Sequence, residues 1–327
     1  MKAFRFLVCL FLTPCLLGGS DFAHLGPVET LDNGAVTLQI ALGVGRIVSF
    51  HRHDEPDWLV VHDEDPNPTW NWNPWGGDRI WPTAQNLNLQ IYKNAGFDPV
   101  IDGKPWELVS KTGTSLEMRS GISPQLGLQV THRIELVGRT ADVLHTYRVE
   151  RLAESNFPVH VWAVTGVREG DLILMDSDPR GVHADNKPYK AWPGACPASP
   201  PQASLLPGTH ILSFTWTKGA ALKLGTYGRW IACVSGAAAF FQSVAYDPEL
   251  PYLEGSNLQS FVNTGTGTYE IETLSPTWFL RKGEARQWSV RWRLLDFPPE
   301  AKTAATKADF LKAQMEASLQ SDHSSAR

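Results

Sequence analysis

Several motifs of common enzyme classes are missing from this sequence of 327 residues. It has no phosphate-binding loop, no dinucleotide fingerprint and no zinc spacing such as CxxC or HExxH. Basic residues are scattered and the net charge is −5, so the clustered basic face of a nucleic-acid-binding protein is missing as well. We therefore expect no nucleic-acid partner, no cofactor and no metal.

Cysteine is also scarce, with four residues in the chain. Cys9 and Cys15 lie in an N-terminal segment that resembles an export signal, which leaves Cys196 and Cys233 for the mature protein. In an oxidising compartment these two suffice for one disulfide. A buried free Cys233 inside a strand is equally consistent with the sequence.

The N-terminal segment has the three parts of a secretory signal. Lys2 and Arg5 precede an apolar run, Phe6 to Leu17, which is followed by the small residues 18–20. The run is too short for a comfortable membrane span. We expect cleavage before Asp21 and a periplasmic or extracellular protein, with residues 1–20 as signal, 21–300 as one β-sandwich domain and 301–327 as a C-terminal helix and tail.

A lipid anchor on Cys15 is the alternative fate of this segment. Residues 12–15 faintly resemble a lipoprotein cleavage box, but Pro14 and Leu16 fit it poorly. We therefore do not expect the anchor, and the sequence does not indicate an oligomeric state.

Short alternating segments separated by tight turns fill most of the mature chain. They predict a mainly β protein, a large antiparallel sandwich or barrel, with one helix at 306–319. Residues 176–208 are rich in Pro, Gly, Ala and Ser and predict a long loop, which in a compact domain is typical of a functional segment or a lid. The expected strands include 36–41, 46–50, 58–61, 87–92, 106–110, 115–119, 126–137, 141–152, 159–167, 172–175, 209–216, 220–225, 229–234, 237–245, 258–263, 268–274 and 286–294.

A tryptophan-rich stretch, residues 69–85, is the most distinctive part of the sequence. It holds Trp70, Trp72, Trp75 and Trp81 around a Gly-Gly turn and the pair Asp78-Arg79. Indole faces beside a guanidinium and a carboxylate suit a sugar, because the C–H faces of the sugar stack and its hydroxyls form charge-assisted hydrogen bonds. An aromatic plug at the end of a β core explains the same residues.

Two glutamates, Glu270 and Glu272, alternate along one predicted strand and so share a face of it. That face could be a site or the solvated face of an edge strand. A glycosidase needs its two carboxylates on opposite sides of the scissile bond, and neighbours on one strand do not flank a sugar.

Other polar residues allow both a structural and a functional interpretation. Asn257 and Gln259 share a strand face and could offer amides to hydroxyls, or could belong to an ordinary loop. His51 and His53, near Asp54 and Glu55, fit a polar hairpin end as well as a metal cluster. Two further histidines, His132 and His145, lie inside predicted strands, where they are more typical of structural side chains.

The order of several weak motifs resembles the galactose mutarotase-like (aldose 1-epimerase-like) superfamily over residues 34–296. The closing pattern is Tyr269 to Leu274, then Leu280-Arg281-Lys282-Gly283-Glu284, then a final strand. Upstream, residues 247–257 resemble a Pro-x-x-x-x-Tyr-x-x-Asn segment, and residues 76–80 stand where the family carries a sugar-binding Asn-Arg. Residues 76–82, 161–165 and 256–260 together look most similar to the uncharacterised DUF4380 branch.

The resemblance implies roles for individual residues. Glu272 matches the family's catalytic base and Arg79 its sugar-contacting arginine, while Asp78 replaces the family's Asn. The family's general-acid histidine has no counterpart at residues 165–166. His132, His145 or His183 could replace it, the last of these, or Asp185, delivered by the loop at 176–208.

Three functions remain open: a carbohydrate-binding protein with weak or no activity at the anomeric centre, an active aldose epimerase or other carbohydrate-active enzyme, and an exported structural domain without ligand. We expect a carbohydrate ligand for either of the first two. Glu272 and His183 are the catalytic candidates. The substrate-binding candidates are Trp75, Asp78, Arg79, Trp81, Gln85, Trp162, Asn257, Gln259 and Glu270.

Overall fold

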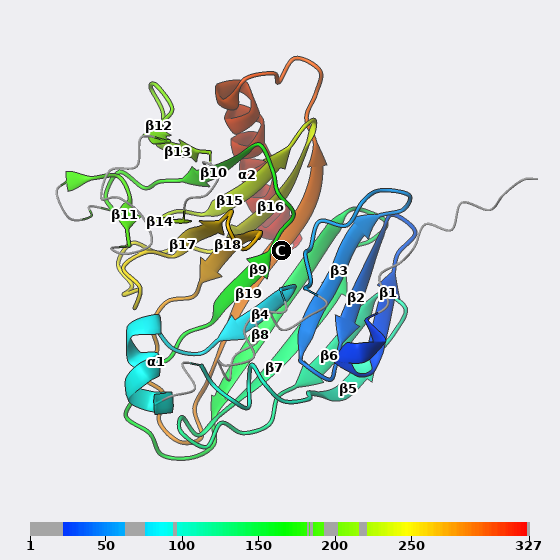
Figure 1. Cartoon of the computed structure of the whole chain (residues 1–327), viewed down its shortest axis with the longest axis vertical. Coiled ribbons are helices and arrows are strands. Elements are labelled where there is room, and N and C mark those ends of the chain that lie inside the picture. Colours follow the sequence, from blue (N-terminus) through cyan, green and yellow to red (C-terminus); the bar gives the residue numbers. More distant parts are fainter. Residues whose placement is uncertain are drawn as a thin grey trace, which may run out of the picture.

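The computed structural model describes residues 22–62, 76–93, 97–181, 183, 186–192, 202–215 and 221–325. Two large antiparallel sheets pack face to face, as the layered strands of Figure 1 show. The predicted mainly β, antiparallel sandwich is thereby confirmed.

The first sheet has nine strands and carries the candidate site on its outer face. Its strand order is β1 (Val28–Asp32), β2 (Val36–Ala41), β3 (Arg46–Arg52), β4 (Asp78–Trp81), β9 (Trp162–Gly166), β18 (Thr268–Leu274), β17 (Leu258–Asn263), β14 (Ala221–Thr226) and β11 (Lys190–Ala191).

The second sheet has ten strands. Its order is β12 (Ala203–Leu205), β13 (Ile211–Phe214), β10 (Leu172–Asp176), β15 (Trp230–Ser235), β16 (Ala238–Val244), β19 (Ala285–Asp296), β8 (Asp142–Arg151), β7 (Leu128–Leu136), β6 (Ser115–Arg119) and β5 (Glu107–Lys111).

Strict alternation of apolar and polar residues builds the long strands. In β7 and β8 every second side chain is buried against the facing sheet, because successive side chains of a strand point to opposite faces. Between the sheets, the rings of Phe50, Phe240 and Trp292 meet with centroids 5.0–5.7 Å apart. This shared aromatic core holds the two sheets together.

The C-terminal helix α2 (Ala304–Ser325) covers the outer face of the second sheet, in red in Figure 1. It is longer than the predicted 306–319. Leu311 and Met315 lie one turn apart and pack against Trp230 and Phe241. None of the helices in the described ranges is long and apolar enough to cross a membrane.

Two predicted strands are wrong. Residues 87–92 belong to helix α1 (Gln85–Tyr92), which follows Pro82. Thr83 Oγ1, just before the helix, donates to Asn88 Oδ1 within it over 2.6 Å. Residues 58–61 form isolated bridges, Leu59 to Val167 and Val61 to Gly76, instead of a continuous strand. A short 3₁₀ helix, Ala23–Leu25, precedes β1.

Candidate functional site

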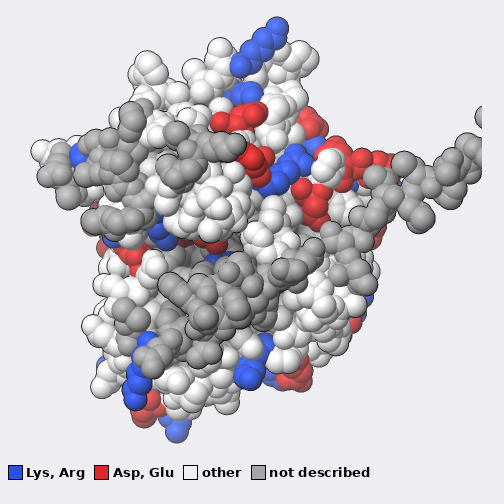
Figure 2. Space-filling view, in the orientation of Figure 1, with Lys and Arg blue, Asp and Glu red and all other residues white. Residues whose placement is uncertain are grey.

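A pocket of ≈ 650 Å³ lies on the outer face of the first sheet, between the sheet and the segments around α1 and residues 253–254. Figure 2 shows acidic and basic side chains together in a hollow on this side of the molecule. Across the sheet, pairing aligns Arg79 with Val164, Val164 with Glu272, and Glu272 with Gln259. Cross-strand partners share a face, so residues far apart in sequence converge here.

Glu272 lies at the floor of the pocket and has two partners. Lys223 Nζ, from β14, lies 3.2 and 3.3 Å from the two carboxylate oxygens, and Trp162 Nε1 donates to Oε2 over 2.7 Å. Burial raises the pKa of Glu272, Lys223 opposes that shift, and the neighbouring Glu270 adds to it. The carboxylate is thus a desolvated base held in one position.

Glu270 lies two residues earlier on the same face and pairs with Arg79, whose Nη2 is 2.9 Å from Glu270 Oε1. Burial alone would lower the pKa of Arg79, but Glu270 and Asp102 outweigh burial and raise it. Because β18 lies between β9 and β17, the solvated-edge interpretation of the two glutamates is wrong.

Aromatic side chains wall the pocket. Trp81 and Trp162 meet edge to face, with ring centroids 5.0 Å apart, and Trp81 Nε1 donates to Asp102 Oδ2 over 2.7 Å. Trp192 follows β11 and lies under two ammonium groups, Lys190 at 4.2 Å and Lys223 at 5.3 Å from its ring centroid. These contacts fix the indoles in place and leave them facing the pocket.

The rim is formed by Gln85, Lys190 and Glu254. Lys190 Nζ donates to the carbonyl oxygen of Glu254 over 2.6 Å, and the Gln85 backbone N–H donates to the carboxylate of Glu254 over 2.6 Å. The Glu254 carboxylate therefore ties the start of α1 to the loop before β17.

Five of the sequence-predicted binding residues line this pocket together with Glu272, and the structure thus brings together residues from three distant parts of the chain. These are Arg79, Trp81, Gln85, Trp162 and Glu270. Trp75 and Asp185 lie outside the described residues.

Three other candidates do not line the pocket. Asp78 lies between the sheets, where Thr165 Oγ1 and Tyr147 Oη donate to its carboxylate over 2.8 and 3.3 Å. Asn257 bonds with both its amide atoms to the backbone of Gly228. Gln259 is fully buried and donates to Ser256 Oγ. As placed, Asp78 and Asn257 are structural, since they are buried and bonded within the protein, whereas Gln259 shares the face of Glu272 but is fully covered.

None of the three candidate histidines, all of them described residues, lines the pocket. His183 stacks on Tyr227, with ring centroids 5.0 Å apart, and burial lowers its pKa to about 4. His132 and His145 lie between the sheets, where their rings share a hydrogen bond of 3.2 Å and burial lowers the pKa of His132 to about 3. As placed, none of the three histidines is positioned to take the part of the missing acid.

Several pocket residues are not predicted from the sequence, and the charged and indole side chains among them are Lys223, Trp192, Lys190 and Glu254. Lys223 interrupts the apolar strand Ala221–Thr226, and its side chain is 8% exposed. A lone lysine in such a strand is the one available signal, but alternation alone does not distinguish a buried lysine from a solvated one. Trp192 belongs to the segment that the sequence predicts as a long loop.

The described residues bear on the metal and disulfide alternatives. In this part of the chain no group of three His, Cys, Asp or Glu side chains is arranged to hold a metal ion. His53 instead contacts Asp32 and His51 the carbonyl of Arg52. Cys233 is a buried free thiol whose pKa burial raises to about 12, and Cys196 lies outside the described ranges.

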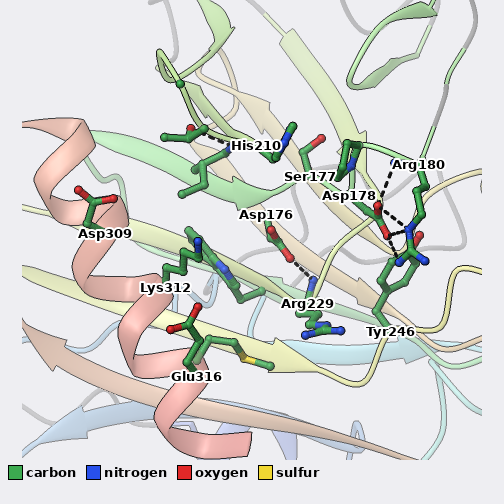
Figure 3. Close-up of a pocket in the computed structure, with 16 residues that line it drawn as sticks. Asp176, Ser177, Asp178, Arg180, His210, Arg229, Tyr246, Asp309, Lys312 and Glu316 are labelled. Carbon is green, nitrogen blue, oxygen red and sulfur yellow. Dashed lines mark hydrogen bonds and ion pairs between the residues drawn. The ribbon is translucent and has the colours of Figure 1, made fainter.

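A second hollow of ≈ 490 Å³ lies between α2 and the ends of β10 and β15 (Figure 3). Some of its charged side chains already have partners: Arg180 forms an ion pair with Asp178, and Asp176 accepts the backbone N–H of Arg229. Trp230 is the single indole among its described lining residues, so it offers less stacking surface to a sugar than the first pocket does.

Comparison with solved structures supports the fold. A putative aldose 1-epimerase from Escherichia coli K12 superposes with a TM-score of 0.57 at 12% identity, covering 83% of this chain and 99% of that chain. A galactose mutarotase-like protein from Lactobacillus casei gives 0.59 at 12% identity, covering 82% and 100%. A putative aldose 1-epimerase from Klebsiella pneumoniae gives 0.54 at 11% identity, covering 87% and 83%.

The chain therefore has a galactose mutarotase-like fold. No family model matches the sequence, and no curated protein matches it. The narrower DUF4380 resemblance consequently has no support from these comparisons.

Proposed function

We propose that this protein binds a carbohydrate in the pocket over β4, β9, β18 and β14, with Glu272 placed to act as a base at the anomeric centre. One observation carries the proposal: four charged side chains from three strands meet in a single pocket lined by indoles. The charged residues are Arg79, Lys223, Glu270 and Glu272.

The lining matches the chemistry of a sugar ring. Trp81, Trp162 and Trp192 offer faces or edges to its C–H groups, and the paired charges offer strong donors and acceptors to its hydroxyls. The volume of ≈ 650 Å³ is within the ordinary range for small-molecule sites.

Glu272 is suited to remove a proton from a bound hydroxyl. It is desolvated, held by the Trp162 N–H, and burial raises its pKa toward the range in which a general base is effective. Glu270 cannot complete a hydrolytic pair, because both carboxylates arise from one face of one strand. The arrangement therefore favours ring opening and closure over hydrolysis.

Binding without catalysis is the second candidate. It is favoured by the absence of histidine among the described pocket residues. The two functions share the same pocket and differ in whether a proton donor serves the ring oxygen.

The N-terminal signal-like segment supports export, so we propose that the sugar is encountered in the periplasm or outside the cell. N-terminal sequencing of the protein recovered from those fractions tests this. A first residue near Asp21 is expected, and a chain beginning at Met1 would contradict export with cleavage.

Calorimetry with D-glucose, D-galactose and short oligosaccharides tests the binding site. Arg79→Ala should weaken binding about ten- to a hundredfold, because a charged hydrogen bond contributes roughly 1.5–3 kcal/mol. Arg133→Ala, which removes a half-exposed arginine of β7, is the matched control and should leave affinity unchanged. Equal affinity of wild type and Arg79→Ala would exclude this pocket.

Glu272→Gln separates the two candidate functions. The amide keeps the size of the side chain and should retain sugar affinity within a few-fold. If the protein is an epimerase, polarimetry on freshly dissolved α-anomers should show mutarotation in the wild type that falls about 10²–10⁴-fold in the variant.

A further inference from the structure

The ammonium group of Lys223 is the one cation in direct contact with Glu272 among the described residues. It comes from β14, three strands along the sheet order from β9, and the pairing of Lys223 with Phe261 and of Phe261 with Glu270 sets it on the pocket face. Any role of Lys223 in catalysis rests on the function proposed for this pocket.

Two indoles hold this ammonium. Lys223 Nζ lies 4.6 Å from the ring centroid of Trp162 and 5.3 Å from that of Trp192. Such cation–π contacts hold the ammonium group in position. Its distances to the Glu272 oxygens, 3.2 and 3.3 Å, exceed the 2.7–2.9 Å that is usual for charge-assisted hydrogen bonds. The contact is loose enough for hydroxyl oxygens to replace it.

We propose that Lys223 is the general acid of this site, which protonates the ring oxygen of an aldose while Glu272 takes the proton of the anomeric hydroxyl. The ring oxygen and the anomeric oxygen are bonded to the same carbon. An acid and a base in direct contact can therefore reach both oxygens at once. Hydrolysis of a glycosidic bond would instead need the two groups on opposite sides of that bond.

The protons balance without a co-reactant. Glu272 accepts the anomeric hydroxyl proton as the C1=O double bond forms, the bond between C1 and the ring oxygen breaks, and Lys223 gives its proton to that oxygen. After rotation about C1–C2 the ring closes on the other face of the carbonyl. The new hydroxyl returns its proton to the Lys223 amine, Glu272 returns its own to the anomeric oxygen, and both side chains regain their initial states.

The other cations of the pocket fit this role less well. Arg79 is bound to Glu270, and a guanidinium does not release its proton in proteins. Lys190 lies at the rim and donates to the Glu254 carbonyl over 2.6 Å. Among the described pocket residues, only Lys223 combines a transferable proton with contact to the proposed base.

The test measures sugar binding by calorimetry and mutarotation of fresh α-D-glucose and α-D-galactose by polarimetry. Lys223→Ala and Lys223→Arg should both lower the mutarotation rate about 10²–10⁴-fold. Lys223→Arg keeps the charge beside Glu272 and should retain sugar affinity within a few-fold. Lys223→Met/Glu272→Gln removes both charges together, and its thermal unfolding checks that lost rate does not arise from a misfolded chain.

Chemical rescue separates proton donation from mere neutralisation of Glu272. Methylammonium should restore mutarotation to Lys223→Ala, and the rescue should vary with the acidity of the amine used. Tetramethylammonium, which carries the charge without a proton, should not restore it.

Each remaining outcome overturns a specific claim. Equal rescue by both cations, or fast mutarotation in Lys223→Arg, would show that Lys223 is not the acid. Wild-type protein that binds sugar without mutarotation would also remove the acid role and leave the binding function intact. Wild-type protein that binds none of the sugars would refute the proposed function itself.

Discussion

Asp78 and Arg79 are neighbours in the chain but serve opposite sides of one sheet. The guanidinium of Arg79 enters the pocket and pairs with Glu270, whereas the carboxyl of Asp78 enters the space between the sheets and meets Thr165 and Tyr147. Thr165 in turn accepts from Gln242 Nε2 of the second sheet over 2.8 Å. The pair thus connects the proposed site to the polar part of the core.

The stability of the protein should depend on pH through Asp78. Burial raises the pKa of this carboxyl to about 7, against about 3.9 in an unfolded chain. Between these values the native state keeps a proton that the unfolded state releases. The contribution of Asp78 to stability is therefore fully present below about pH 4 and is lost as pH rises through 7.

Asp78→Asn mimics the neutral acid and should remove this dependence. From pH 5 to pH 7, the free energy of unfolding of the wild type should fall, relative to that of the variant, by on the order of 1 kcal/mol per pH unit. Urea titrations at each pH measure it, with Asp309→Asn on the exposed side of α2 as control. A difference between Asp78→Asn and wild type that stays constant with pH would contradict the prediction.

Gly225 should be required for the position of Trp192. A methyl group on Gly225 would lie 2.6 Å from Ser256 Oγ and 2.9 Å from Trp192 Cη2, closer than such atoms approach. Gly225→Ala should therefore displace the indole and weaken sugar binding several-fold, about 1 kcal/mol. Calorimetry measures this effect.

Gly113→Ala is the matched control, because nothing lies within 4 Å of the added methyl group. It should leave affinity unchanged. If Gly225→Ala bound sugar as tightly as Gly113→Ala, Trp192 would not be a wall of the binding site.

Loss of packing under α2 should reduce stability without affecting the pocket. Leu311 is fully buried against the outer face of the second sheet, so Leu311→Ala should lower the free energy of unfolding by about 2–5 kcal/mol. Lys312→Ala, one residue further on the exposed side, should change it by less than about 0.5 kcal/mol. Sugar affinity should be the same in both folded variants, and a selective loss in Leu311→Ala would show coupling between α2 and the site.

Much of the fold is readable from the sequence because sheet burial imposes a period of two. β7 and β8 follow that period over their whole length and are placed correctly. Helix α1 is wrongly predicted as a strand because Leu87, Leu89 and Ile91 alternate with polar residues. Leu87 and Ile91 are also one helical turn apart, and so short a segment fits both periods.

The sequence predicts a residue of the site only where a local pattern of neighbouring residues indicates it. The Trp-rich stretch and the alternating glutamates point to Arg79, Trp81 and Glu272, which the structure brings into one pocket. The same alternation could have shown that Asp78 faces away from Arg79. Lys223 and Trp192 depend on which strands become neighbours, and that order is set by the closure of the whole sheet.

The row that runs from Arg79 through Glu272 to Lys190 crosses six adjacent strands, contributed by chain segments from residue 79 to residue 272. No fragment of the chain can keep the site, because each strand supplies what its neighbours lack. A ligand would therefore bind only the fully folded protein and would stabilise it against unfolding. At a free concentration one hundred times its dissociation constant, such a ligand adds about 2.7 kcal/mol to the free energy of global unfolding, and so opposes every unfolding event that takes the sheet apart.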